Sequence, residues 1–268
     1  MEAEEGRKGI PSLLSSQGEC IATNITQLIG WTPLIELINI TEKDGIGARL
    51  IGKIETYQHL SSVKDWSALS HRLIQDAEEK GLITPGTTML LGVTSGNHGI
   101  NTDAIPWRTS GINVYVLDQF TNPANPDAHF RWTGPEIWKD TAGKVDIFIA
   151  ASGSGGTITG MGRYLKMKNP SVKLICVEPA ESPVITSLKN PGLQIETLAN
   201  TRAEPGSDET RWVGVAAPAV GATDGFASRE ENRGKMTVTM FSSGAERYLN
   251  SELFAHVNEE CVNINMTF

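Results

Sequence analysis

Residues 145–177 read VDIFIAASGSGGTITGMGRYLKMKNPSVKLICV, and this stretch decides the fold. Val145 to Ala150 is an apolar run with the length of a buried strand, and Val172 to Val177 is another. Between them, a glycine-rich turn over Ser152 to Gly160 leads into a helix predicted over Met161 to Lys168. Strand, helix and strand in this order form a βαβ unit, whose two strands lie parallel in one sheet.

The turn of this unit is suited to bind a phosphate. It contains Gly153, Ser154, Gly155, Gly156 and Thr157. Glycines let backbone N–H groups approach phosphate oxygens, the two hydroxyls add donors, and the helix N-terminus favours negative charge. A tight strand-to-helix turn without a ligand is the alternative. Ile158 stands where a dinucleotide fingerprint needs glycine, and the lysine of a P-loop is missing, so a single small phosphate ligand fits best.

Lys64, in Ser61-Ser62-Val63-Lys64-Asp65, precedes a run of apolar residues at helical spacing that predicts a helix from about 63 to 80. At the first turn of a helix, the dipole disfavours the ammonium form, so the amine becomes a nucleophile able to form a Schiff base. A solvated surface lysine is the alternative. Ser61 and Lys64 also match the serine-lysine pair of penicillin-recognising hydrolases, but the Lys-Thr-Gly element expected with it is absent.

A second polar turn, Thr94-Ser95-Gly96-Asn97, follows Thr88 to Val93, a nearly continuous apolar run that predicts a buried parallel strand. Open parallel sheets place their ligands at this end of their strands, and the turn offers hydroxyls, an amide and backbone N–H groups to a carboxylate. A helix N-cap has a similar composition. His98, in the same turn, is either a proton carrier or a structural histidine.

The remaining pattern predicts one α/β fold with short elements. Further strands are expected over Leu34 to Ile40, Ala48 to Glu55, Val114 to Leu117 and Lys235 to Phe241, and a helix over Glu246 to His256. Pro123, Pro126 and Pro135 predict mostly loop with one short helix, and residues 187–211 predict a long surface loop. Residues 1–24 are interpreted as an N-terminal arm.

Composition limits the function classes. The 268 residues carry 23 basic and 31 acidic side chains, a formal charge of −8 without a basic block, so nucleic acid is a poor candidate partner. No apolar run approaches the length of a membrane span. The three cysteines, Cys20, Cys176 and Cys261, form no metal-ligand spacing and suit free thiols in a reducing compartment. The expectation is a cytoplasmic protein without a metal.

A lysine at a helix start, a carboxylate-binding turn and a phosphate-binding turn together point to pyridoxal 5′-phosphate as the cofactor. Lys64 would hold its aldehyde, Gly153 to Thr157 its phosphate, and Thr94 to Asn97 the carboxylate of an amino-acid substrate. The cofactor would act as an electron sink, and the protein would orient the reactants. An NAD-binding protein is an alternative that rests on the βαβ unit and on Glu178 as a ribose ligand.

The chain resembles the plant and bacterial cysteine synthases, the O-acetylserine (thiol) lyases of the tryptophan-synthase-β-like, fold-type II pyridoxal-phosphate enzymes. The similarity covers roughly residues 25–190 and 234–254, with the motifs in the family's order. The motifs are Leu28-Ile29-Gly30-Trp31-Thr32-Pro33-Leu34, Ser61 to Asp65, Thr94 to Asn97, Gln119 to Pro126, Thr133 to Trp138, Gly153 to Gly160, and Glu246 to Leu249.

This resemblance implies a three-layer, doubly wound, mostly parallel sheet over residues 25–268, with a small movable lobe at about 66–118. It implies that Lys64 forms the internal aldimine and later takes the α-proton, and that Asn97 bonds the cofactor's ring hydroxyl. Thr94, Ser95, Asn97 and Gln119 would bind the substrate carboxylate. The implied reaction converts O-acetylserine and sulfide to cysteine and acetate. Family members are usually dimeric, and they can associate with serine acetyltransferase.

The sequence also departs from the family pattern. The stretch from Gly99 to Gln119 is too short for the family's whole small lobe, so a reduced lobe is expected. The family has a stretch whose serine faces the ring nitrogen of the cofactor. In its place, this chain has Gly214-Val215-Ala216-Ala217-Pro218, which contains no hydroxyl group. A catalytically impaired relative that keeps the scaffold and binds cofactor or a partner therefore remains an alternative. Sulfide, cyanide and thiosulfate all remain open as the nucleophile, since His98 matches none of the residues expected for the first two.

Overall fold

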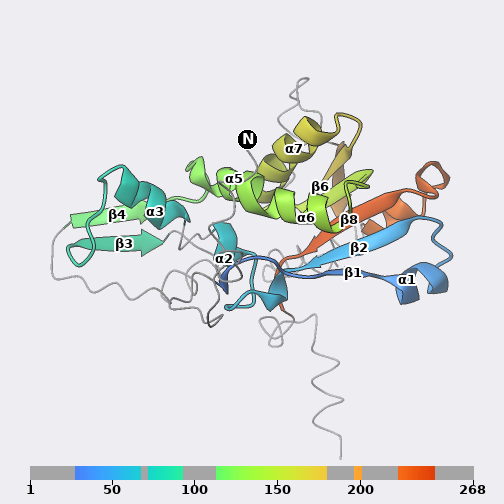
Figure 1. The fold of residues 1–268 in the computed structure, drawn as a ribbon, viewed down its shortest axis with the longest axis horizontal. Coiled ribbons are helices and arrows are strands. Elements are labelled where there is room, and N and C mark those ends of the chain that lie inside the picture. Colours follow the sequence, from blue (N-terminus) through green and yellow to red (C-terminus); the bar gives the residue numbers. More distant parts are fainter. Residues whose placement is uncertain (1–27, 68–71, 93–112, 180–195, 201–222, 245–268) are drawn as a thin grey trace, which may run out of the picture.

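The computed structural model describes residues 28–67, 72–92, 113–179, 196–200 and 223–244. Figure 1 shows a body built on one sheet and a lobe that projects from it. The elements are β1 (Leu34–Glu36), α1 (Ile38–Lys43), β2 (Arg49–Ile54), η4 (Glu55–Tyr57), α2 (Lys64–Ser67), α3 (Arg72–Glu79), β3 (Thr88–Gly92), β4 (Asn113–Leu117), α5 (Ala124–Ala128), η5 (His129–Thr133), α6 (Gly134–Asp140), β5 (Ile147–Ala151), α7 (Gly156–Lys168), β6 (Lys173–Pro179), β7 (Glu196–Asn200), η6 (Glu230–Asn232) and β8 (Met236–Phe241).

The body is a six-stranded sheet in the order β1-β2-β8-β5-β6-β7. Every neighbouring pair is parallel except β1 and β2. The central strand is β8, which pairs with β2 on one side and β5 on the other, although it comes last of the six in sequence. This arrangement confirms the predicted α/β fold with a mostly parallel sheet.

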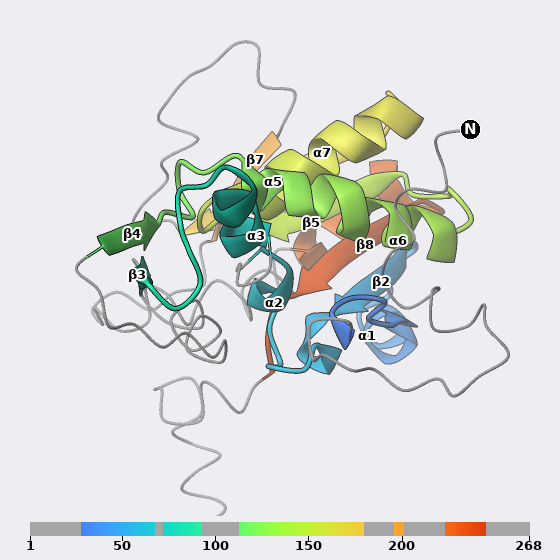
Figure 2. The same cartoon turned by 60° about the vertical axis from the view of Figure 1, so that its left-hand side comes forward.

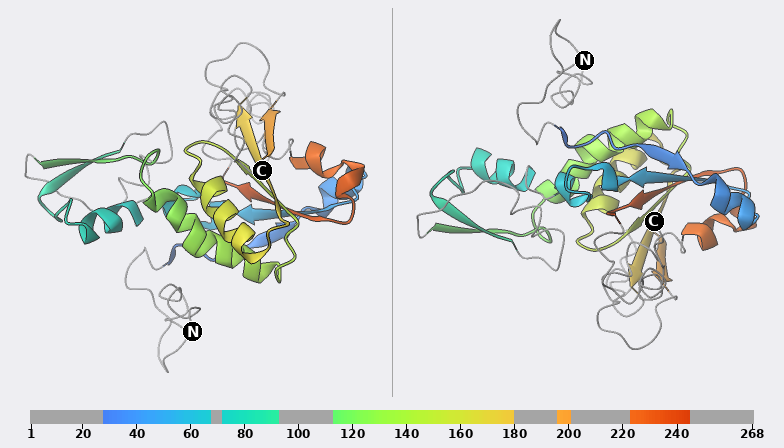
Figure 3. Two further views of the ribbon diagram at one scale, coloured as in Figure 1. Left: turned by 90° about the horizontal axis from the view of Figure 1, so that it is seen from above. Right: turned by 90° about the horizontal axis from the view of Figure 1, so that it is seen from below.

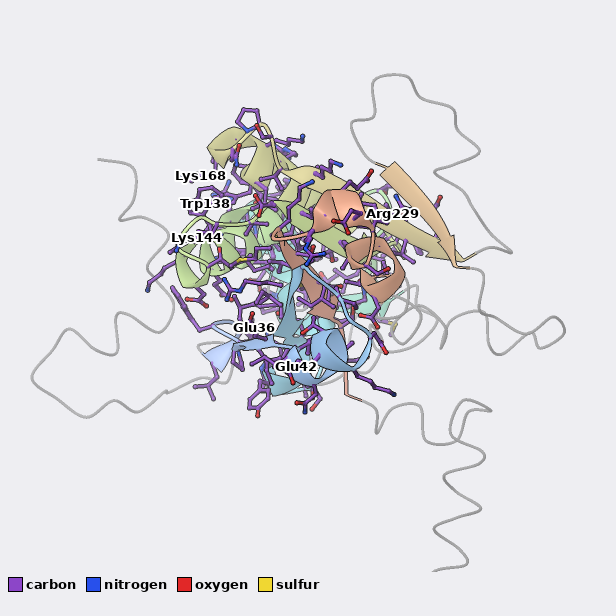
Figure 4. All side chains as sticks on the ribbon, turned by 90° about the vertical axis from the view of Figure 1, so that its right-hand side faces the viewer. Glu36, Glu42, Trp138, Lys144, Lys168 and Arg229 are labelled. Carbon is purple, nitrogen blue, oxygen red and sulfur yellow. The ribbon has the colours of Figure 1, made fainter. Side chains whose placement is uncertain are left out.

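Both faces of the sheet are covered, which explains the continuous apolar run of β5. Ile147 and Ile149 join a buried cluster with Phe226, which lies in a helical segment at 223–227. Phe148 and Ala150, which point to the other face, join the cluster that includes Met161 of α7. Helices α5, α6 and α7 lie side by side on that second face (Figure 2). Figure 4 shows Trp138 and Lys168 on this helical layer and Arg229 on the opposite side.

The βαβ unit is present as β5, α7 and β6, with its helix starting earlier than the sequence indicates. Gly155 adopts a φ of 78° and ends the turn, so Gly156 and Thr157 already belong to the first turn of α7. The first turn holds Ile158 between threonines and glycines, so the helical pattern is clear only from Met161 onward. The last two residues of the predicted phosphate-binding turn therefore belong to the helix N-terminus.

The projecting lobe consists of α3 and a separate two-stranded parallel sheet of β3 and β4. It lies at the end of the molecule away from α1 (Figure 3). Its core contains Leu73, Ile74, Ala77, Ile83, Leu117 and Ala124. Met89, Val114 and Val116 remain 44–56% exposed, so the expectation that Thr88 to Val93 is a buried strand is wrong for one face. The cause is coverage: in the described residues, α3 packs on a single face of this sheet.

Two further expectations need correction. The strand from Leu34 ends at Glu36, and residues 38–43 form α1. The predicted surface loop at 187–211 contains β7, which pairs with β6. Within the helix predicted over 63–80, the structure describes α2 and α3, and residues 68–71 lie outside the described residues. The predicted N-terminal arm at 1–24 and the helix at 246–256 lie outside the described residues.

The proline-rich segment was expected to be mostly loop, yet it forms α5, η5 and α6 in succession. Pro123 is the N-cap of α5, Pro126 lies in its first turn, and Pro135 is the second residue of α6. A proline in the first turn of a helix removes no intrahelical hydrogen bond. Between the two helices, η5 is a π-type turn, which adjusts the backbone ahead of Pro135.

Candidate functional site

Lys64 is the first residue of α2, and the segment before it is fastened to the chain just beyond β8. The backbone N–H of Val63 donates to Ser242 O at 2.7 Å, and Gly244 N–H donates to Ser61 O at 3.3 Å. The N–H of Lys64 donates to Ser62 Oγ at 3.2 Å. These contacts place Lys64 at the carboxyl end of the central strand, where open α/β sheets bind ligands.

Burial lowers the pKa of the partly buried Lys64 below its ordinary value of 10.5. From the sequence, we expected the helix dipole to lower this pKa. Helix α2 is only four residues long, however, and burial is the cause of the lowered pKa. No described residue forms an ion pair or a hydrogen bond with the Lys64 Nζ. An amine in this position is available to a ligand and is more readily neutral than a solvated lysine.

The turn from Gly153 to Thr157 lies at the same edge of the sheet, directly after β5. The N–H of Ser152 still donates to Val177 O of β6 at 2.9 Å, so the turn starts where the strands end. A Cβ placed on Gly153 or Gly155 would meet no atom within 4 Å, so their outer side is open. The turn leads into the 13-residue helix α7, whose N-terminus favours an anion.

The inner side of this turn is bonded to the layer of α5 and η5. Asn125 Nδ2 donates to Ser154 Oγ at 2.9 Å and to Gln119 O at 2.8 Å. His129 Nε2 lies 3.1 Å from Thr157 Oγ1, and its Nδ1 lies 3.0 Å from Thr133 Oγ1. Both hydroxyl-bearing residues of the turn are therefore held by side chains from behind.

Two glycines allow this close approach between α7 and α5. A Cβ on Gly156 would collide with the side chain of Asn125, and one on Gly160 would collide with the backbone carbonyl of Pro126. The second collision is with rigid backbone, so any larger residue at 160 must push the helices apart. The glycines at 156 and 160 thus serve the packing of α7 against α5.

His129 links the turn to Lys64. Its pKa is lowered to about 3, first by burial and second by repulsion from the charge of Lys64. Helix α2, which begins at Lys64, packs against α5, which ends directly before His129. Because His129 bonds Thr157, the predicted aldehyde-binding and phosphate-binding groups lie on neighbouring elements.

Gln119 is the one predicted substrate-binding residue within the described chain. It follows β4 by two residues and is 8% exposed, and its Oε1 is buried without a hydrogen-bond partner. Gly92, the last residue of β3, is paired with Leu117, the last of β4. The chain therefore leaves β3 beside Gln119, but Thr94, Ser95, Asn97 and His98 themselves lie outside the described residues, as does Ala217.

The prediction from the sequence did not include Asn125, His129 and Thr133 in this site. Asn125 was quoted only as part of a family motif, and the histidine was not singled out. The two side chains lie four residues apart, the spacing that places residues on one face of a helix. The signal was lost because the prolines led us to expect loop there.

A buried ionic network fixes the N-terminal motif beside β2 and α6. Lys53 Nζ donates to Glu136 Oε2 at 2.6 Å and to Thr32 O at 2.7 Å. Glu55 accepts from Thr32 Oγ1 at 2.8 Å and from Gln58 Nε2 at 2.9 Å. Burial raises the pKa of Glu55 to about 7, against the opposing effect of Lys53, and burial also raises the pKa of Glu136.

Other reactive groups of the described residues give no competing site. Cys176 is a buried free thiol whose pKa is raised to about 12 by burial and by Glu178. Over the described ranges, no three His, Cys, Asp or Glu side chains cluster as metal ligands. None of the helices seen there has the length and apolar character needed to cross a bilayer.

Comparisons with known proteins show the family to which the chain is related. A family model described as pyridoxal-phosphate dependent enzyme matches residues 107–239. Cysteine synthase 3 of Caenorhabditis elegans is 35% identical over 307 residues, covering 87% of this chain and 90% of that protein. Cysteine synthase A of Escherichia coli K12 is 34% identical, covering 70% of this chain and 68% of that protein. The crystal structure of a cysteine synthase from Entamoeba histolytica is similar with a TM-score of 0.72 and 28% identity, covering 90% of this chain and 93% of that one.

The nematode alignment extends over 307 residues, more than the 268 of this chain, so the relative has segments without a counterpart here. None of these three proteins comes from a plant, and the plant-type assignment stays a prediction. The likeness in sequence and in fold extends over most of the chain. The chain belongs to the cysteine synthase family of pyridoxal-phosphate-dependent enzymes.

Proposed function

We propose that this chain binds pyridoxal 5′-phosphate and catalyses a β-replacement in which O-acetylserine and sulfide give cysteine and acetate. The observation that carries the proposal is the packing of α2, which begins at Lys64, against α5, because His129 directly follows α5 and is bonded to Thr157 of the predicted phosphate-binding turn. The named relatives are cysteine synthases, which supports this substrate class.

The described residues fit the cofactor. The open side of Gly153 and Gly155, the hydroxyls of Ser154 and Thr157 and the N-terminus of α7 suit its phosphate. Lys64 would hold its aldehyde carbon, and Asn97 its ring hydroxyl. When bound, the cofactor supplies an electron sink for charge that develops at the substrate's Cα.

The substrate side of the proposal assigns Thr94, Ser95, Asn97 and Gln119 to the carboxylate of the amino acid. The side-chain amide of Gln119 can donate through Nε2 while its Oε1, which is without a partner, accepts from the ammonium group or water. Lys64 Nζ, with its lowered pKa, would take the proton from the substrate's Cα. Loss of acetate then leaves a carbon that accepts the sulfide.

Cofactor binding is tested with purified protein. Pyridoxal phosphate should produce a visible absorption band, and borohydride reduction followed by peptide mass spectrometry should find the cofactor on Lys64. Lys64→Ala should abolish both signals. Lys144→Ala is the matched control, because Lys144 is exposed in the loop before β5 (Figure 4), at the opposite end of this strand from the turn. A band that survives in Lys64→Ala would contradict the assignment.

Turnover is tested with O-acetylserine and sulfide, and cyanide and thiosulfate are tested in parallel as nucleophiles. The measured product is cysteine or the corresponding analogue.

The second candidate function, an impaired relative that keeps cofactor or partner binding, is favoured by Ala217 in place of the family's serine and by the alignment segments without a counterpart. A normal visible band with no product from any of the three nucleophiles would support that candidate.

The proposal extends to assembly and location. We expect a homodimer in the cytosol that can associate with serine acetyltransferase, as the family resemblance implies. Light scattering coupled to size-exclusion chromatography measures the mass, and co-elution tests the association. A monomeric mass or separate elution would contradict the respective expectation.

A further inference from the structure

The structure determines that the hydroxyl of Ser154 accepts a hydrogen bond from Asn125. Gln119 O is a carbonyl and can only accept, so the Asn125 side chain must turn its NH₂ group toward it. The second proton of that NH₂ group then points to Ser154 Oγ. Ser154 accepts there, and its own hydroxyl proton is left for a ligand on the open side of the turn.

The direction of the hydrogen bond between Thr157 and His129 does not follow from the distance between them. His129 Nε2 at 3.1 Å either donates to the threonine hydroxyl or accepts from it, depending on which ring nitrogen carries the proton. Thr157 has one hydroxyl proton. If it gave that proton to His129, it would present only lone pairs to an anion held by the turn, which is repulsive. A phosphate that accepts a hydrogen bond from the Thr157 hydroxyl therefore requires a proton on Nε2.

The other side of the imidazole can satisfy this requirement. Nδ1 lies 3.0 Å from Thr133 Oγ1, whose hydroxyl can donate to it. Protons then point in one direction from Thr133 through His129 to Thr157. Because the pKa of His129 is held near 3, the ring remains neutral and Nδ1 keeps the lone pair that accepts from Thr133.

We propose that His129 is a positioning residue which, protonated on Nε2 and oriented by Thr133, turns the Thr157 hydroxyl proton toward the cofactor phosphate, as Asn125 does for Ser154. This inference rests on the proposed function, since the anion is taken to be the phosphate of pyridoxal phosphate. His129 touches the turn from behind, and its effect should therefore be confined to the phosphate end of the cofactor.

The test compares two ligands that differ only in the phosphate. Dissociation constants of pyridoxal phosphate and of pyridoxal are measured for the wild type, His129→Gln and His129→Asn. The amide of glutamine reaches the position of Nε2, whereas the shorter asparagine reaches only that of Nδ1. We expect His129→Asn to bind pyridoxal phosphate about tenfold more weakly. Pyridoxal binding should not change, and His129→Gln should recover most of the loss.

Equal losses for both ligands, or a glutamine variant as weak as the asparagine variant, would overturn the inference. Thr133→Val provides an independent variant of similar shape that removes the donor to Nδ1, and it should weaken only pyridoxal phosphate. Thermal unfolding of the apo-proteins checks that each variant folds. If the histidine variants do not fold, the binding data of Thr133→Val decide whether the inference holds.

A direct readout is the ¹⁵N spectrum of histidine-labelled wild-type holoprotein, with the His129 signals assigned by their absence in His129→Asn. A protonated Nε2 and an unprotonated Nδ1 are expected, and the reverse pattern would overturn the inference. Wild-type protein that binds neither ligand would overturn the proposed function together with this inference. Wild-type protein that binds both ligands equally well would overturn the inference alone.

Discussion

Lys53 Nζ and Glu136 Oε2 lie 2.6 Å apart, and the two side chains are 0% and 3% exposed. Glu136→Gln leaves the buried ammonium group without its counter-charge, which should lower the free energy of unfolding by about 3–5 kcal/mol. The backbone N–H of Trp31 can still donate to the amide oxygen at the position of Oε1, so the loss reports the missing charge and the missing hydrogen bond to Lys53. Urea unfolding followed by tryptophan fluorescence measures it.

The matched variant is Lys53→Met combined with Glu136→Gln, which removes both charges. This double variant should be more stable than Glu136→Gln alone, because no charge is left buried without a partner. Strictly additive losses from the two single changes would show that the pair is not coupled.

Glu55 should make stability depend on pH. Its folded-state pKa of about 7 is raised above the unfolded value of 4.5, so the folded protein binds a proton that the unfolded chain has lost between these values. Stability should therefore fall by about 3 kcal/mol as the pH rises from 4.5 to above 7. Glu55→Gln should flatten the curve in this window, since the Thr32 hydroxyl can turn from donating to accepting. Urea midpoints at half-unit pH intervals provide the comparison.

Gly160→Ala should disturb both the fold and the site. Its Cβ would meet the Pro126 carbonyl and the Cβ of His129, forcing α7 away from α5. We expect a loss of about 1–3 kcal/mol of stability together with weaker cofactor binding. Gly225→Ala is the control, because its Cβ would meet no atom within 4 Å and Gly225 is the exposed residue of the helical segment at 223–227. It should stabilise by up to about 1 kcal/mol, and a similar loss in both variants would refute the packing argument.

Adjacent residues of β4 should respond in opposite ways. Leu117 is fully buried in the lobe core, so Leu117→Ala should cost about 2–5 kcal/mol. Val116 is 44% exposed on the other face of the strand, and Val116→Thr should change stability by less than about 0.5 kcal/mol. Thermal unfolding of the two variants against the wild type measures both. A large loss from Val116→Thr would mean that this face is covered in solution.

The central strands and the βαβ unit were predictable because β5 and β6 are buried on both faces and read as unbroken apolar runs. The same rule failed for β3 and β4, since an apolar run does not reveal whether a second layer covers it. The segment containing Pro123, Pro126 and Pro135 was misjudged because proline breaks a helix only when it falls beyond the first turn.

Within the site, Lys64 and the turn at Gly153 were predictable from local chemistry. The support behind that turn was not, because Asn125 and His129 act through contacts with residues 28 or more positions away in sequence. Burial of Lys53 beside Glu136 was likewise hidden, since charged residues are rarely inside and only tertiary packing identifies the exceptions.

The central place of β8 has a consequence for how the molecule is made. β2 and β5 each pair with β8 and not with one another, so each of the two strands lacks a partner on one edge until β8 has been synthesised. On the ribosome, the unfinished sheet should expose two strand edges at its centre, a state prone to aggregation. A chain ending before Met236 would contain every predicted site residue, yet it would lack the strand whose end fastens Val63 beside Lys64.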